Sequence, residues 1–352
     1  MLLCVLALAA PADAEPAVRA VGTQLRQGEQ PFHVYGFNYD FNGKHPNLDY
    51  IERPTSARLL RMRSDFARAR RLGANTIRIY LELHEFMATA TRTRPRALRA
   101  LRRTLDEAER AGLLVDITGN LAWHPEHSPA WYDALPDSSR WQVQARFWRA
   151  VAAVGARSPS VLCYELTSEP VIGESDDWYA GVLVHHYVQY VVRELAGRDP
   201  VRLAREWTRT LRDAIRSRDR RHLITIGLLP LRGSAFDPGN VADLLDLITV
   251  HEYPRAGDAA ESISRIRSFA NHGRPLLLGE TFAFDRDTEE IVLLATRGSL
   301  DGTLSFYDGR APEDVAATTP ADEMYRRNLI SYLGLRTSLR ASPPLSRRYR
   351  PE

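Results

Sequence analysis

Two glutamates each end a short apolar stretch of this chain. Glu169 closes the run that begins at Val161 and is followed by Pro170, and Glu280 closes the run that begins at Pro275. Proline cannot continue a ladder of strand hydrogen bonds, so Glu169 is expected at the carboxyl end of its strand. Chemistry in α/β folds gathers at that edge. Two carboxyl groups facing each other, one holding a proton and one ionised, are what cleavage of a glycosidic bond requires.

Other polar residues occupy predicted strands near these acids. Arg78 lies at the end of the strand predicted over 75–80, where its charge would lower the pKa of Glu280. It would serve equally as the partner of an interior acid, Glu165 or Asp116, and the two roles can coexist. One residue separates His251 from Tyr253 in the strand predicted over 247–253, so their side chains point to the same face. There they either line a functional site or pack in the interior of the fold.

Aromatic side chains follow several of the same strands and would suit the apolar faces of sugar rings. Each one alone is better explained by packing, whereas their concentration on one rim favours binding by Trp123 and Trp178. No third ligand accompanies the histidine pairs at 124/127 and 185/186 at a metal-binding spacing, so neither a metal nor a cofactor is expected. The candidate sugar-binding residues are Trp123, His124, Trp131, Trp178, Tyr179, Phe306 and Tyr307.

Strand and helix signals alternate eight times along the chain, which predicts an α/β fold of the (β/α)8 TIM barrel type. A small hairpin over 17–35 precedes the core, and an insertion over 171–197 follows the fourth strand and is expected to wall one side of the cleft. A doubly wound sheet is the rival, but no Gly-x-Gly-x-x-Gly follows any strand. Strands are predicted over 33–38, 75–80, 113–118, 161–169, 223–227, 247–253, 275–280 and 302–307, with helices over 56–72, 95–111, 138–156, 201–218, 258–271, 287–297 and 320–337 and a short one near Asn240.

Length and composition are compatible with one large domain. The 352 residues are 44% hydrophobic and 26% charged, and the net charge is +3. Almost all of the basic residues are arginine. The basic run from Arg58 to Arg71 has helical spacing and is interpreted as the solvated face of an amphipathic helix rather than a nucleic-acid site. Residues 1–14 resemble a signal peptide, which predicts a secreted or periplasmic protein without membrane insertion. Residues 15–340 are expected to form the domain and 341–352 a disordered tail.

The motifs around the two acids resemble those of the clan A retaining glycoside hydrolases, closest to the family 5 cellulases and β-mannanases. Tyr164-Glu-Leu-Thr-Ser-Glu169-Pro170 resembles the Trp-Glu-Leu-x-Asn-Glu-Pro form of the mannanase branch. The stretch 278–282 resembles its nucleophile strand, and Gly22-Thr23 with the stretch 36–39 resembles its amino-terminal hairpin and first strand. The resemblance implies that Glu169 is the acid/base, that Glu280 is the nucleophile, and that Tyr253 positions it. The implied substrates are oligo- or polysaccharides, β-linked hexose glycans of mannan or glucan type.

Two positions depart from the family pattern. Ser168 precedes the acid/base where the family has an asparagine that contacts the sugar 2-hydroxyl, and Phe306-Tyr307 stands where it has a tryptophan. Both departures affect contacts with the sugar, whereas the carboxyl groups of Glu169 and Glu280 are retained. They leave open two alternatives, a barrel that binds glycan without cleaving it and a transglycosylase using the same covalent intermediate.

Overall fold

The computed structural model describes residues 17–41, 45–121, 128–172, 189–192 and 194–341. The expected signal peptide, most of the insertion after the fourth strand, and nearly all of the expected tail lie outside these ranges. In the described part of the chain, no helix combines the length and the apolar character needed to cross a membrane.

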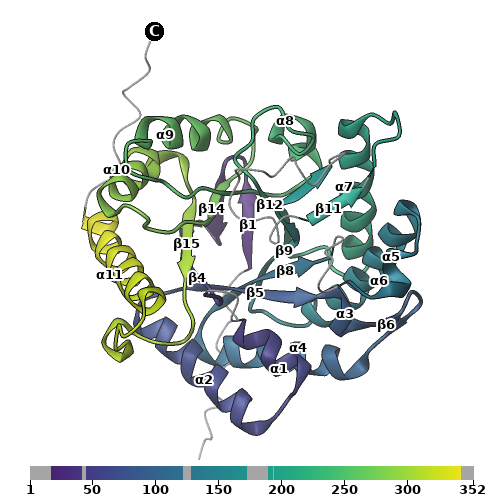
Figure 1. The fold of residues 1–352 in the computed structure, drawn as a ribbon, viewed down its shortest axis with the longest axis horizontal. Coiled ribbons are helices and arrows are strands. Elements are labelled where there is room, and N and C mark those ends of the chain that lie inside the picture. The colour runs from purple at the N-terminus through teal and green to yellow at the C-terminus, as the bar shows by residue number, and fades with distance from the viewer. Residues whose placement is uncertain (1–16, 42–44, 122–127, 173–188, 193, 342–352) are drawn as a thin grey trace, which may run out of the picture.

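Eight parallel strands close into a barrel surrounded by helices (Figure 1), which confirms the predicted TIM barrel. The last strand pairs with the first, with Gly302 opposite Val34 and Phe306 opposite Asn38. Side chains at the carboxyl ends of the strands therefore converge on one mouth. In barrel order the strands are β4 (Val34–Asn38), β5 (Thr76–Glu82), β8 (Leu114–Asn120), β9 (Val161–Ser168), β12 (Leu223–Leu228), β13 (Ile248–His251), β14 (Leu276–Glu280) and β15 (Gly302–Phe306).

Several outer helices carry, at their ends, residue types that are favoured at helix termini. Pro95 stands in the first turn of α4, and Gly112 ends that helix in a left-handed conformation, φ 68°, that glycine adopts without strain. The Asp199 side chain caps α7 by accepting from the Val201 amide, and Asp285 caps α10 by accepting from Thr288. These helices are α2 (Ser56–Arg71), α4 (Pro95–Ala111), α6 (Asp137–Gly155), α7 (Pro200–Arg216), α8 (Pro238–Val241), α9 (Ala259–Ser268), α10 (Arg286–Thr296) and α11 (Pro320–Ala341).

A small antiparallel sheet of β1 (Val18–Val21), β2 (Gln24–Gln27) and β3 (Gln30–Pro31) precedes the barrel. Leu25 from this sheet packs in one buried cluster with Val34, Leu162, Leu277 and other residues near the amino ends of the barrel strands. The Leu25 amide also donates to Asp301 Oδ1 at 2.8 Å. The sheet therefore closes the end of the barrel opposite the mouth.

Short elements near the mouth were not predicted. They are α1 (Pro46–Glu52), α3 (Leu83–Phe86), the hairpin of β6 (Met87–Thr89) and β7 (Arg92–Thr93), α5 (Ala130–Asp133), and the parallel pair of β10 (Pro170–Ile172) and β11 (Gln189–Val192). None is long enough to show a hydrophobic period in the sequence.

Candidate active site

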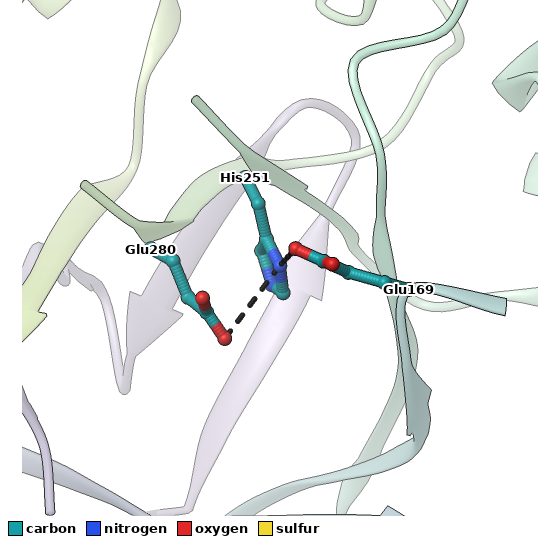
Figure 2. Close-up of side chains that lie close together, drawn as sticks. All are labelled: Glu169, His251 and Glu280. Atoms are coloured by element: carbon teal, nitrogen blue, oxygen red, sulfur yellow. Dashed lines mark hydrogen bonds and ion pairs between the residues drawn. The ribbon is translucent and has the colours of Figure 1, made fainter. Parts of the chain in front are cut away.

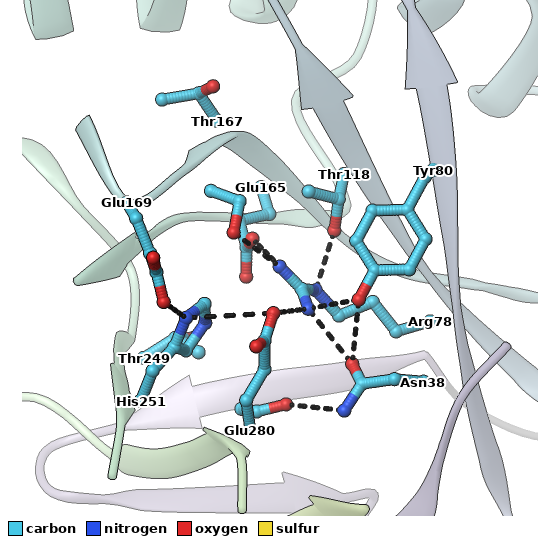
Figure 3. A network of polar contacts seen from close by, with 12 residues as sticks. Asn38, Arg78, Tyr80, Thr118, Glu165, Thr167, Glu169, Thr249, His251 and Glu280 are labelled. Atoms are coloured by element: carbon cyan, nitrogen blue, oxygen red, sulfur yellow. Dashed lines mark hydrogen bonds and ion pairs between the residues drawn. The ribbon is translucent and has the colours of Figure 1, made fainter. Parts of the chain in front are cut away.

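The guanidinium of Arg78 joins the polar side chains at the barrel mouth (Figure 3). Arg78 lies in the middle of β5 rather than at its end, and it is wholly buried. Its Nη1 donates to Glu280 Oε1, and its Nη2 donates to Glu165 Oε1 at 2.5 Å. Its Nε donates to Thr118 Oγ1 at 2.8 Å. The two roles expected for Arg78 therefore coexist, since it pairs with an interior acid and with the acid ending β14.

Both oxygens of Glu280 are held by donors. Oε1 accepts from Arg78, and Oε2 accepts from the hydroxyl of Tyr253, two residues beyond the end of β13. Burial alone would raise the pKa of Glu280, but His251, Arg78 and the Tyr253 hydrogen bond outweigh it and hold that pKa below its usual range. The arrangement keeps Glu280 ionised and fixes its direction.

Glu169 follows β9 directly and faces Glu280 across the imidazole of His251 (Figure 2). Nδ1 of His251 lies 2.9 Å from Glu169 Oε1 and 3.6 Å from Glu280 Oε1. Burial lowers the pKa of His251, but the charge of Glu280 and the hydrogen bond to Glu169 outweigh it and raise the pKa. The histidine therefore links the two acids that the sequence placed on different strands.

Glu169 has a left-handed backbone, with φ 50°. This region is costly for a residue with a Cβ, and such strain occurs mostly at functional sites. The Glu169 amide donates to the Gly227 carbonyl at 2.7 Å, and its carbonyl accepts from Gln189 at 3.0 Å. These bonds hold the backbone in the turn that carries the carboxyl group.

The ring of His251 fits only because its neighbouring strands carry glycine. A Cβ at Gly227 would lie 2.8 Å from His251 Nε2 and 2.6 Å from Glu165 Oε1. A Cβ at Gly279 would lie 2.2 Å from Thr249 Cγ2 and 3.3 Å from the same imidazole nitrogen. Both glycines thus make room for the side chains that line the site.

Glu169, His251 and Glu280 are also the described residues best placed to hold a metal ion, because one ligand atom from each lies within 4.8 Å of the others. Arg78 already supplies positive charge to this set, and His251 shares its Nδ1 with Glu169. The charge of the donor set is therefore already compensated by side chains, and we assign no metal to it.

The two aromatic residues predicted at the end of β15 have different surroundings. Phe306 is partly exposed, and its ring centroid lies 6.3 Å from that of Tyr253. Tyr307 is wholly buried, and its hydroxyl donates to the carbonyl of Asp65 in α2 at 3.0 Å. The prediction that Tyr307 contacts sugar is wrong, because successive strand residues point to opposite faces.

Ser168 lies within the network, since its hydroxyl is 3.3 Å from Arg78 Nη2. Trp131 stays partly exposed and packs against Tyr132 at the start of α5. Trp123, His124, Trp178 and Tyr179 lie outside the described residues.

Three site residues were missed by the sequence analysis. Asn38 Oδ1 accepts from Arg78 at 2.9 Å, while its Nδ2 donates to the Gly279 carbonyl at 3.1 Å. The Tyr80 hydroxyl accepts from Arg78 at 2.6 Å. Asp40, two residues beyond β4, is buried and interacts electrostatically with Glu280 and Arg78. Their position at the end of a predicted barrel strand is the signal that could have found Asn38 and Asp40.

No protein-family model and no curated protein sequence matches the chain. Solved structures do match it. A GH5_18 protein from Streptomyces cattleya, in complex with GlcNAc, is 17% identical with a TM-score of 0.66, over 90% of this chain and 82% of that one. An endo-1,4-β-mannanase from Eisenia fetida is 16% identical with a TM-score of 0.65, over 90% of this chain and 95% of that one.

An exo-β-1,4-mannosidase from Opitutaceae bacterium strain TAV5 is 16% identical, with a TM-score of 0.63 over 88% of this chain and 60% of that one. The chain has the fold of the family 5 glycoside hydrolases. The resemblance stated from the sequence motifs is thus confirmed at the level of the fold.

Proposed function

We propose that this chain is a retaining glycoside hydrolase that cleaves β-linked hexose glycans, mannan- or glucan-like, by double displacement. The observation that carries the proposal is the approach of the two acids, whose nearest ligand atoms lie within 4.8 Å. Retaining enzymes hold their carboxyl groups about 5–5.5 Å apart, whereas inverting enzymes leave about 6.5–9.5 Å for a water molecule. The spacing therefore favours direct attack by a carboxylate.

In the first step, Glu280 attacks the anomeric carbon while Glu169 gives its proton to the leaving oxygen. The glycosidic bond breaks, and an ester to Glu280 forms. In the second step, Glu169 takes a proton from water, the oxygen of that water attacks the same carbon, and Glu280 leaves as a carboxylate. The two inversions retain the configuration of the sugar.

The surrounding side chains suit these roles. Arg78 and Tyr253 stabilise the ionised form of Glu280, which is the attacking form and also the leaving form. His251 fixes the direction of Glu169. Tyr253 presents a partly exposed ring beside Glu280, and the partly exposed ring of Phe306 lies next to that of Tyr253. Aromatic faces of this kind suit the apolar face of a pyranose.

The similar structures support the choice of glycan. They include an exo-β-1,4-mannosidase, an endo-1,4-β-mannanase and a GH5_18 protein in complex with Manβ1-4GlcNAc. A β-mannosidic substrate is therefore the first to assay, with β-glucans next.

The test compares wild type with Glu280→Gln on aryl β-mannosides, aryl β-glucosides, soluble mannan and soluble glucan. We expect wild type to release sugar with retained configuration, and Glu280→Gln to lose about 10³-fold or more in kcat. Glu169→Gln should lose far more on substrates with poor leaving groups than on activated aryl glycosides, because only the former need the proton.

Asp301→Asn, at the closed end of the barrel, is the control and should retain activity. Products longer than the substrate would instead indicate transglycosylation. Glycan binding without any release of sugar by wild type would refute the proposed hydrolysis.

A further inference from the structure

Asp40 is a buried acid at the mouth that the double displacement does not use. It lies two residues beyond β4 and is 8% exposed. Its Oδ1 is fully buried and has no hydrogen-bond partner among the described residues. Among the described residues, His45 is a cationic candidate within ion-pair distance, with its Nδ1 3.5 Å from that oxygen. A buried carboxyl oxygen without a hydrogen bond is costly, so its retention calls for a reason.

Asp40 belongs to the same side-chain cluster as the proposed nucleophile. The ring of His45 packs against that of Tyr80, with centroids 4.9 Å apart, and the Tyr80 hydroxyl accepts from Arg78. Arg78 in turn donates to Glu280. Burial raises the pKa of Asp40 to about 8, and the charge of Glu280 adds to that effect. At neutral pH Asp40 is thus a carboxylic acid that can both donate and accept a hydrogen bond.

In the order of the closed barrel, Asp40 lies nearer to the strand of Glu280 than to the strand of Glu169. Asp40 follows β4, which is two strands from β14 by way of β15, whereas β4 is three strands from β9 by way of β5 and β8. The leaving oxygen of a substrate must meet Glu169 while its anomeric carbon meets Glu280. Phe306 ends β15, the strand between β14 and β4, so a sugar ring that stacks on Phe306 would extend from Glu280 towards Asp40.

We infer that Asp40 is a specificity residue that hydrogen-bonds a hydroxyl of the sugar whose anomeric carbon is attacked, on the part of the ring remote from that carbon. The inference rests on the proposed function and deepens it, since it assigns a polar contact to the glycone side of the site. The Asp40 side chain keeps 11% of its surface exposed, and a sugar hydroxyl would contact the carboxyl group through that part. A substrate without that hydroxyl should be rejected, because the acid would stay unsatisfied.

The test is a cycle of protein and substrate changes. Wild type, Asp40→Asn and Asp40→Ala are assayed on an aryl β-hexoside and on its 3-, 4- and 6-deoxy analogues. On the parent substrate we expect Asp40→Ala to lose roughly 10-fold or more in kcat/KM, and Asp40→Asn to lose less, because the amide keeps a donor and an acceptor. For one deoxy analogue wild type should show a similar loss, with little further loss in Asp40→Ala.

Asp301→Asn is again the matched control, a buried aspartate at the opposite end of the barrel that contacts the backbone of Leu25 and Leu276. It should lower the unfolding temperature without changing preference among the analogues. Binding of each analogue to Glu280→Gln and to Glu280→Gln/Asp40→Ala, followed by calorimetry, gives a readout that needs no turnover.

The outcomes separate the two proposals. If kcat/KM of Asp40→Ala falls by the same factor on every analogue, or does not fall, Asp40 does not recognise a sugar hydroxyl. The hydrolase proposal then stands unchanged. If wild type cleaves nothing yet binds the parent sugar through Asp40, the hydrolase proposal fails and the Asp40 contact survives. If wild type neither cleaves nor binds any of these sugars, both fail.

Discussion

Two acids on neighbouring barrel strands are both wholly buried, yet the protein avoids an unpaired charge on them in different ways. Glu165 on β9 forms an ion pair with Arg78 at 2.5 Å. Asp116 on β8 is the register partner of Arg78, but the guanidinium bonds Thr118 on that strand instead. Among the described residues, the carboxyl group of Asp116 has only the weak thiol donor of Cys163 beside it. Burial, and then the charge of Glu165, raise the pKa of Asp116 to about 8.

The proposed chemistry needs the charge of Glu280, whereas the barrel interior excludes a charge on Asp116. At the mouth, Arg78 keeps Glu280 ionised by geometry, so its charge changes little near neutral pH. Beside it, Asp116 avoids an unpaired charge by keeping its proton, which makes that position sensitive to pH.

The largest effect is expected from removing the shared cation. Arg78→Met leaves Glu165 and Glu280 buried without their partner, so we expect a loss of about 3–5 kcal/mol in unfolding free energy and at least about 10³-fold in kcat/KM. Denaturant unfolding and glycoside assays measure the two quantities. Arg63→Met removes a half-exposed partner of Glu107, and it should cost clearly less unfolding free energy than Arg78→Met, because solvent screens that pair. Equal costs for both variants would contradict the view that burial makes the Arg78 pairs distinct.

The next effect concerns stability against pH. The native chain keeps the Asp116 proton up to a pKa of about 8, whereas the unfolded chain releases it near 3.8. Native protein therefore binds more protons between these values, and this residue makes stability fall as pH rises from about 4 to 8. Asp116→Asn should remove that fall, with a relative gain on the order of 5 kcal/mol at pH 8, because about four pKa units separate the two states and each corresponds to about 1.4 kcal/mol. Unfolding measured across this range tests it. The exposed Asp213→Asn is the control, and an unchanged slope in Asp116→Asn would contradict the assignment.

The smallest effect is expected at the rim of the Arg78 network. Tyr253→Phe removes one donor to Glu280 while leaving the Arg78 bond in place. Because that donor helps hold the pKa of Glu280 down, its loss should move the acidic limb of the kcat/KM profile to higher pH and lower the plateau about 10-fold. Phe306→Leu, a change in the neighbouring ring, should weaken substrate binding without moving the limb. A limb that moves equally in both variants would mean that Tyr253 acts only through packing.

Most of the barrel could be predicted because its elements carry strong local signals. The prediction of α4 over 95–111 matches the observed helix, whose proline and glycine mark its ends. The strands were found as short apolar runs between turns. By contrast α1, α3 and the β6–β7 hairpin were missed, since elements of a few residues pack against the barrel through contacts that no local period reveals.

The site was predictable where the position on a strand decided the direction of a side chain. Glu169, Glu280, His251 and Arg78 converge as expected, because strand ends in a closed barrel face one mouth. The same rule should have excluded Tyr307, which follows Phe306 and so points to the opposite face. Asn38 and Asp40 were missed because short polar residues after a strand are also ordinary turn residues. Only the fold places them beside Arg78 and Glu280.

The left-handed backbone at Glu169 has an evolutionary consequence. Glycine or asparagine would occupy that conformation more easily than glutamate, but neither can extend a carboxyl group to His251. Proteins that descend from this one and are no longer selected for the proposed reaction would thus be expected to lose the glutamate at position 169 early. The residue type at position 169 would therefore separate working members of such a lineage from those that have lost the chemistry while keeping the fold.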